Sequence, residues 1–276
     1  MIFTTWISDS NIQWNDLTLT TKSESYAFGR RLYTFQVAQQ QYWLKFHLAN
    51  THDVLEQAFQ RELDFYQQHA QTEQTFLLAH QIIQLRDITN GMDFPECGVG
   101  LLSRDTNQFF DTIVNVANTE AIQLKILIAL DALGSMHQLG WIHGDLKVEH
   151  FRLYENSCKL IDFEQSCKLE HSIQSLTATP RYMAPELFHR KPKTAQTDLY
   201  AFGIILYEWL SQTRLSAKNY RDWAVLHCQE LEIQLPNELQ CFLPLLNGLL
   251  QKHKERRLNS VVEAKHCLNM INLLQK

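Results

Sequence analysis

The hydrophobic pattern of the chain changes near residue 104, and this change restricts the possible folds more than any other feature. Before it, aromatic and β-branched runs at residues 32–39 and 41–47 predict two strands joined by a tight connection. After it, apolar residues recur every three or four positions, as on one face of a helix. A β-rich part over residues 1–104 followed by a helical part over residues 105–276 predicts an α+β, bilobal fold with a ligand cleft between its lobes.

The same patterns predict the remaining elements. Asp53 is expected to cap a helix that runs to about His69, and Asn118 or Thr119 to begin the first helix of the second part. Asn90-Gly91 predicts a turn between two further strands of the first part. Strands are expected at residues 82–85, 99–103, 151–153 and 159–161, and later helices at 199–210, 238–250 and 260–274.

Composition excludes several classes of protein. With 276 residues, 45% of them hydrophobic, the chain is too apolar for a disordered tail. A formal net charge of −5 provides no broad cationic field for nucleic acid or acidic lipid. No apolar run reaches the ~18 residues that span a bilayer, and the first residues do not resemble a secretory signal. The six cysteines form no C-x-x-C pair, so a cytoplasmic protein without a zinc site is expected.

Two acidic segments carry the strongest chemical signal. Residues 143–150 read His-Gly-Asp-Leu-Lys-Val-Glu-His, and residues 162–164 read Asp-Phe-Glu. Taken alone, Asp145 and Asp162 are each ordinary turn residues. Together they are separated by seventeen positions with a short strand between, so a hairpin can bring both carboxylates to one edge. Two carboxylates beside a lysine suit phosphoryl transfer, in which one orients a hydroxyl and the other holds Mg²⁺.

These segments resemble the catalytic loop (H-R-D-L-x-x-x-N) and the metal loop (D-F-G) of the protein kinases. Three more matches follow in the family's order. Residues 179–186 resemble the end of the kinase activation loop, and residues 198–203 the start of its buried central helix. Arg257 stands where kinases keep an arginine that pairs with the glutamate of A-P-E, here Glu186. The resemblance implies a kinase-like fold with a β-rich N-lobe and a helical C-lobe, together one kinase domain.

The resemblance also implies roles for single residues. Asp145 would orient the acceptor hydroxyl, and Lys147 would contact the transferred phosphate, which favours Ser or Thr acceptors. Asp162 and His150 would bind the metal. Lys45, within the Tyr-Trp-Leu-Lys of residues 42–45, would position the phosphates of ATP.

The N-terminal part matches the family less well. Glu62 is the better partner for Lys45 because it borders the apolar stripe of its helix, and Glu56 is the alternative. The glycine-rich loop is reduced to Gly29, the one candidate there for phosphate binding. Trp43 replaces a small alanine, so either the strand register differs or the nucleotide pocket is crowded.

Two departures concern the catalytic and metal loops. Gly144 replaces an arginine of the catalytic loop, and Glu164 replaces the glycine of D-F-G. His150 replaces an asparagine that holds the second metal, and imidazole suits ions softer than Mg²⁺, so a preference for Mn²⁺ is a hypothesis.

The function expected from the resemblance is ATP- and Mg²⁺-dependent phosphorylation of Ser/Thr hydroxyls in protein substrates, without a nucleic-acid partner. One alternative is a small-molecule or lipid-sugar phosphotransferase of the same fold, which residues 179–186 argue against because such enzymes usually lack this peptide platform. The other is a pseudokinase scaffold, favoured by the reduced glycine loop, Trp43 and His150. The sequence indicates neither the physiological substrate nor the oligomeric state.

Overall fold

A computed structural model describes residues 17–70, 74–88, 98–111, 113–171 and 178–271 of the chain. The chain divides into two compact units. The first comprises residues 1–73 and 78–106, and the second residues 74–77 and 107–276. The sequence pattern places the boundary at residue 104, close to the structural boundary. It gives no sign that the short segment 74–77 belongs to the second unit, with which it pairs through the bridge between Leu77 and Leu160. That residues 1–104 and 105–276 act as the two lobes of one domain remains a prediction.

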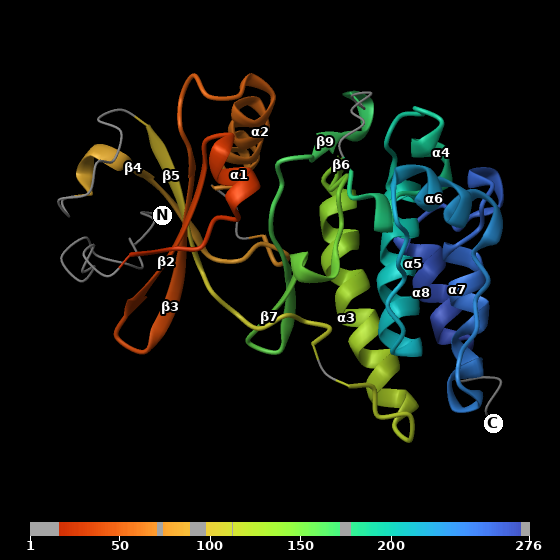
Figure 1. The fold of residues 1–276 in the computed structure, drawn as a ribbon. Coiled ribbons are helices and arrows are strands. Elements are labelled where there is room, and N and C mark those ends of the chain that lie inside the picture. The colour runs from red at the N-terminus through yellow and green to blue at the C-terminus, as the bar shows by residue number, and fades with distance from the viewer. Residues whose placement is uncertain (1–16, 71–73, 89–97, 112, 172–177, 272–276) are drawn as a thin grey trace. The chain divides into compact units, whose positions relative to one another are not determined.

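An antiparallel sheet forms the first unit (Figure 1). Its strand order is β1-β2-β3-β5-β4. Ala38, with a φ of 54°, lies in the tight turn between β2 and β3, where the glutamine run was expected to connect two strands. The expected strands are therefore present with shifted ends, and Asn90-Gly91 falls outside the described residues. The five strands are β1 (Thr18–Leu19), β2 (Arg30–Val37), β3 (Gln40–His47), β4 (His80–Gln84) and β5 (Val99–Arg104).

Helix α2 (Asp53–His69) contacts strand β3 of this sheet. Its apolar stripe is buried, and Glu62 is buried with it. The expectation that Asp53 caps the helix is wrong by one residue, since the N-cap is His52 and Asp53 is the first helical residue. An acidic side chain in the first turn still opposes the positive end of the helix dipole.

The second unit is helical and is organised around α5 (Ala195–Ser211) (Figure 1). Thirteen of the seventeen residues of α5 are buried, so apolar side chains cover it on all sides. A capping box between Thr194 and Thr197 fixes its start. Helix α3 (Thr119–Gln138) begins as expected, with the Asn118 side chain accepting a hydrogen bond from the Ala121 amide.

Shorter elements complete this unit. The expected helix over 238–250 is divided into a 3₁₀ turn, Asn237–Phe242, and α7 (Leu243–Leu249), because Pro244 lacks an amide hydrogen and favours the first turn of a helix. The structure adds α4 (Pro185–Phe188) and α6 (Tyr220–Val225), which the sequence did not indicate. The last described helix is α8 (Val261–Asn269), and the strands are β6 (Trp141–Ile142), β7 (Phe151–Tyr154), β8 (Ser157–Leu160) and β9 (Cys167–Lys168).

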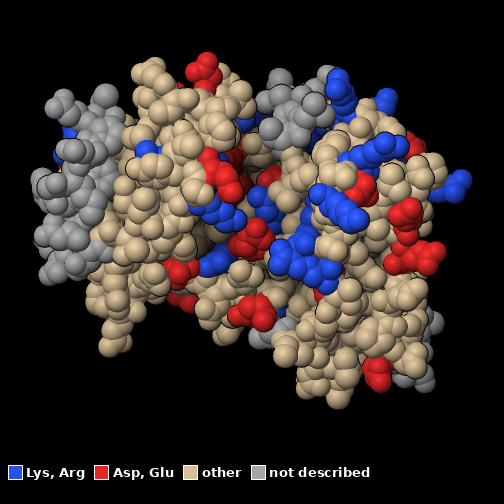
Figure 2. Space-filling view, in the orientation of Figure 1, with Lys and Arg blue, Asp and Glu red and all other residues tan. Residues whose placement is uncertain are grey.

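Acidic and basic side chains are interspersed on the face drawn in Figure 2. This mixture agrees with the small net charge of −5. Over the described residues, every helix is too short or too polar to cross a lipid bilayer.

Candidate active site

In the first unit, Lys45 and Glu62 form a buried ion pair. The Lys45 Nζ atom lies 2.7 Å from Glu62 Oε2, and their side chains are 15% and 2% exposed. Glu56, the alternative partner, instead accepts a hydrogen bond from the Thr51 amide. The expected pairing of Lys45 with Glu62 is confirmed, and it holds the ammonium group in one place, since breaking such a pair leaves a buried charge uncompensated.

The segment before β2 differs from an open phosphate-binding loop. Residues Ser23–Ala27 form a short helix, α1, and the Gly29 amide donates a hydrogen bond to the Tyr26 carbonyl at 3.1 Å. Gly29 has a φ of +92°, and an added Cβ would lie 2.0 Å from Oγ1 of Thr51. Arg31 lies over the Tyr26 ring at 3.5 Å and donates to the Tyr26 carbonyl. Gly29 thus makes a close turn here, and its contact with phosphate remains a prediction.

Trp43 and Lys45 lie on the same face of β3. Tyr42, Leu44 and Phe46 alternate with them and are buried on the other face. The indole therefore lies on the face that carries Lys45, and its effect on nucleotide binding remains a prediction.

In the second unit, the carboxylate of Asp198 holds the loop of residues 143–150. Asp198 lies in the first turn of α5 and is 1% exposed. It accepts hydrogen bonds from the amides of His143 and Gly144, at 2.8 and 2.9 Å, and from Nε2 of His137 at 2.9 Å. Burial alone would raise the pKa of Asp198, but these donors outweigh it and the pKa is lowered. In the sequence, Asp198 marks the start of the central helix, and no motif points to this role.

Asp145 and Lys147 form the next part of the loop. Lys147 Nζ lies 3.1 Å from Asp145 Oδ2, while Asp145 Oδ1 accepts the Thr179 amide at 2.7 Å. Burial acts to lower the pKa of Lys147, but the charges of Asp145 and Asp162 outweigh it and the pKa is raised. Lys147 is thus positively charged at neutral pH and lies within the field of both aspartates.

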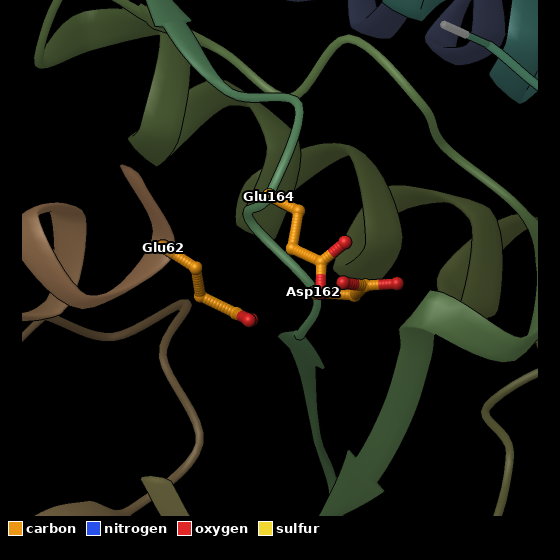
Figure 3. A group of neighbouring side chains, drawn as sticks. All are labelled: Glu62, Asp162 and Glu164. Atoms are coloured by element: carbon orange, nitrogen blue, oxygen red, sulfur yellow. The ribbon is translucent and has the colours of Figure 1, made fainter. Parts of the chain in front are cut away.

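Asp162 follows the hairpin of β7 and β8, which lies between the two acidic segments as expected. Its φ is +66°, a left-handed conformation that is unusual outside glycine. His150 Nε2 lies 3.2 Å from Asp162 Oδ2. Figure 3 draws Asp162 and Glu164 on this loop and Glu62 on α2 of the other unit. Carboxylate oxygens of Asp162 and Glu164 lie within 4.8 Å of each other, so both can offer oxygen to one cation.

His143 is a structural member of the loop. Its ring lies 5.4 Å from the Phe163 ring and stacks at 5.3 Å on His150, and its Nε2 lies 3.1 Å from the Ile161 carbonyl. Burial lowers the pKa of His143 to about 4, so the ring is neutral at neutral pH. The neutral ring donates from Nε2 to the carbonyl, as expected for a packing residue and not for a base.

Lys193 occupies the space beside Gly144. A Cβ added to Gly144 would lie 2.6 Å from the Gln165 carbonyl oxygen, and 3.0 and 3.2 Å from Cδ and Nζ of Lys193. Lys193 is only 2% exposed. Where the kinase pattern has an arginine, this chain therefore has a glycine, with the buried side chain of Lys193, just before α5, beside it. No periodicity or motif pointed to Lys193.

Glu186 and Arg257 pair as expected. The guanidinium donates to both carboxylate oxygens, at 2.7 and 2.8 Å, and the Arg257 side chain is fully buried. It also donates to the carbonyls of Gln251 and Gln196. The end of residues 179–186 is thus fastened to the loop before α8.

The family model of the protein kinase domain matches residues 60–270. The match includes Glu62 and both acidic segments, whereas Lys45 and Gly29 precede it. It covers well over half of the chain.

Named relatives agree with this match. A probable serine/threonine-protein kinase of Dictyostelium discoideum is 36% identical over 42% of this chain and 9% of its own length. A probable serine/threonine-protein kinase of Encephalitozoon cuniculi is 30% identical over 50% of this chain and 24% of its own length. The serine/threonine-protein kinase Sgk1 of Rattus norvegicus is 35% identical over 47% of this chain and 31% of its own length.

These alignments span less than a third of the length of the relatives. The fold and the family are nevertheless shown, because the domain model matches most of the chain and the structure has a β-sheet unit followed by a helical one. The chain belongs to the protein kinase domain family.

Proposed function

We propose that this chain is a catalytically competent kinase that transfers the γ-phosphate of ATP to Ser or Thr hydroxyls of protein substrates. The observation that carries the proposal is the arrangement of Asp145, Lys147 and Asp162 within one unit. Asp145 and Lys147 are in contact, and the charge of Asp162 reaches the same ammonium group. A scaffold that had lost its chemistry would not need to maintain this charged group.

Each residue has a defined task in this proposal. Asp145 orients the acceptor hydroxyl and accepts its proton, and the Lys147 ammonium stabilises negative charge on the transferred group. The Thr179 amide and Lys147 hold the two oxygens of Asp145 in place. Lys45, fixed by Glu62, would bind the α- and β-phosphates.

The donor set of the second unit fits a hard divalent cation. Asp162 and Glu164 supply carboxylate oxygens, which Mg²⁺ prefers. When bound, the ion would neutralise phosphate charge. With a hydrogen on Nε2, His150 would donate to Asp162 and orient it, and it becomes a ligand only if this nitrogen turns its lone pair toward the ion. Preference for Mn²⁺ tests this second arrangement, because imidazole favours softer ions than Mg²⁺.

The proposal is tested by thermal shift with ATP and Mg²⁺ or Mn²⁺, followed by transfer of radiolabelled phosphate to a generic protein substrate. Asp145→Asn is expected to keep the nucleotide-dependent shift and to lower transfer by about 10²- to 10⁴-fold, the usual contribution of a general base. Asp131→Asn, a change at an exposed aspartate that pairs with Lys265 on the surface, is the matched control and should retain activity.

The outcomes separate the three candidate functions. Absence of any shift with either ion would identify a scaffold without nucleotide binding. A shift with transfer to small acceptors alone would identify the small-molecule phosphotransferase. Equal transfer by wild type and Asp145→Asn would remove Asp145 from the chemistry and contradict the proposed mechanism.

A further inference from the structure

The helical unit contains a cavity of about 610 Å³ that uses none of the proposed catalytic residues. Three segments line it: α4 with the residues that follow it, the π-helical turn Leu226–Glu230, and the loop between α7 and α8. This volume is in the range of sites that bind a ligand much larger than a single ion. The cavity therefore has the size of a binding site for several residues of a peptide.

The lining is basic, in contrast to the chain as a whole. Lys191, Lys252 and Lys254 contribute positive charge, and His189 and His253 lie beside them. Within the described part of the chain, no carboxylate lies within 4.0 Å of these three ammonium groups. Although the net charge of the chain is −5, three lysines without a nearby carboxylate thus gather in this cavity.

The two acidic residues of the lining do not cancel this charge. Glu186 is engaged by the buried guanidinium of Arg257 through both of its oxygens. Glu255 is exposed and forms no ion pair among the described residues, so its single negative charge offsets only one of the three lysines. The cavity consequently keeps an excess of positive charge for an incoming ligand.

The cations are held on a rigid base. Arg257 ties Glu186 to the carbonyls of Gln251 and Gln196, which fastens α4 to the loop before α8 and to the start of α5. Gln196 in turn donates to the Lys254 carbonyl at 2.9 Å. The Lys252 ammonium donates to the Gln229 carbonyl. Because the backbone that carries the lysines is already ordered, a ligand loses less free energy to ordering when it binds.

The side-chain types indicate the kind of anion. Arginine recognises a phosphate group through two parallel hydrogen bonds, whereas lysine acts as a compact point charge. The arginine at this place, Arg257, is buried and occupied by Glu186, so lysines supply the charge that faces the cavity. Pro185 and Pro192 add apolar surface between the charges. Several separated carboxylates on a flexible chain suit this lining better than one compact phosphate.

We propose that this basic cavity binds an acidic segment of a protein partner, with Asp or Glu side chains facing Lys191, Lys252 and Lys254. The binding needs neither nucleotide nor phosphoryl transfer, and it does not depend on the function proposed above. A partner or substrate that carries such a segment would be held at the helical unit, at a place separate from Asp145.

The test measures fluorescence anisotropy of the full chain with a labelled Glu-rich peptide, without nucleotide, and with a Gln-rich peptide of the same length. The Glu-rich peptide is expected to bind and the Gln-rich peptide is not. Lys191→Gln/Lys254→Gln should weaken binding about tenfold, as expected for two lost charge contacts. Binding should also weaken as KCl rises from about 50 to about 300 mM.

A matched double variant tests whether location matters and not only net charge. Lys218→Gln/Lys265→Gln removes the same charge from other parts of the helical unit and should change affinity less than twofold. Both double variants should unfold in urea at the same midpoint as wild type. This readout separates lost binding at the cavity from a general defect.

Several results would overturn the proposal. Equal weakening by the two double variants would mean that net charge alone attracts the peptide. Displacement of the peptide by inorganic phosphate at low millimolar concentration would identify a simple anion site. Tighter binding of a single-stranded oligonucleotide than of the Glu-rich peptide would identify a polyanion site of another class.

Discussion

Gly144 and Gly140 share the same φ angle in different surroundings, so comparing them separates the cost of a positive φ from the cost of a close contact. Both have a φ of +77°, which a residue with a Cβ adopts at a cost of about 1 kcal/mol. A Cβ on Gly140 would meet nothing within 4 Å, whereas one on Gly144 would lie 2.6 Å from the Gln165 carbonyl. We expect Gly140→Ala to cost about 1 kcal/mol and Gly144→Ala about 2–4 kcal/mol of unfolding free energy.

Urea unfolding of the two variants measures this difference directly. Gly140→Ala serves as the control for conformation, so any excess in Gly144→Ala reports the contact with Gln165 and Lys193. Equal losses in the two variants would show that the loop shifts to accept a methyl group. The close packing of Lys193 against Gly144 would then contribute nothing measurable to the unfolding free energy.

The aspartates of the helical unit show how environment assigns a role to one residue type. Asp198 is buried and accepts hydrogen bonds from two amides and a histidine, so it fixes the loop and has no exposed oxygen for chemistry. Asp145 contacts an amide and an ammonium group and remains partly exposed. Burial and partners, rather than residue type, separate the structural carboxylate from the proposed catalytic one.

At the scale of elements, the pair of Glu186 and Arg257 joins three segments of the helical unit. Arg257 is fully buried and also binds the Gln196 and Gln251 carbonyls. Removing one partner of a buried ion pair typically costs 3–5 kcal/mol because the other charge is left unpaired. We therefore expect Glu186→Gln to lower the unfolding free energy by about 3 kcal/mol.

A double-mutant cycle checks this prediction. Arg257→Met alone should destabilise the protein, and Glu186→Gln/Arg257→Met should be more stable than the sum of the single losses predicts, because no charge is then left buried alone. Additive losses would mean that the two side chains contribute separately and that the ion pair does not couple the segments.

The elements that the sequence predicted well are those with strong local signals. The α3 start follows from Asn118, the β2–β3 hairpin from aromatic alternation, and the Lys45–Glu62 pair from the position of Glu62 beside an apolar stripe. Contacts between distant segments left no such signal. Lys193 reaches Gly144 from a position nearly fifty residues later, and α1 forms from five residues where the family pattern suggested a glycine loop.

At the scale of the whole molecule, buried neutral histidines make stability depend on pH. Burial lowers the pKa of both His143 and His227 to about 4, and it also lowers the pKa of His80. In the unfolded chain these rings titrate near 6.5. Between these values the unfolded state binds more protons than the folded state, so stability is complete above about pH 6.5 and decreases as pH falls toward 4.

His227 provides a variant that isolates part of this effect. Its ring lies between Trp223 and Phe188, each stacked at 5.8 Å, and its Nδ1 lies 2.9 Å from the Tyr200 hydroxyl. From pH 6.5 to pH 5.0, one histidine that stays neutral in the fold costs about 2 kcal/mol of unfolding free energy. Glutamine does not titrate, so between pH 6.5 and pH 5.0 the unfolding free energy of His227→Gln should fall by about 2 kcal/mol less than that of wild type.

Urea unfolding at pH 7.5, 6.5 and 5.0 measures the effect, with His266→Gln on the exposed face of α8 as the matched control. The control should keep the wild-type pH dependence, because it removes an exposed ring and leaves the buried histidines in place. If His227→Gln also keeps the wild-type dependence, His227 is protonated inside the folded unit. Its burial between two aromatic rings would then not determine its charge, and the acid sensitivity of the molecule would have to arise at His143 and His80.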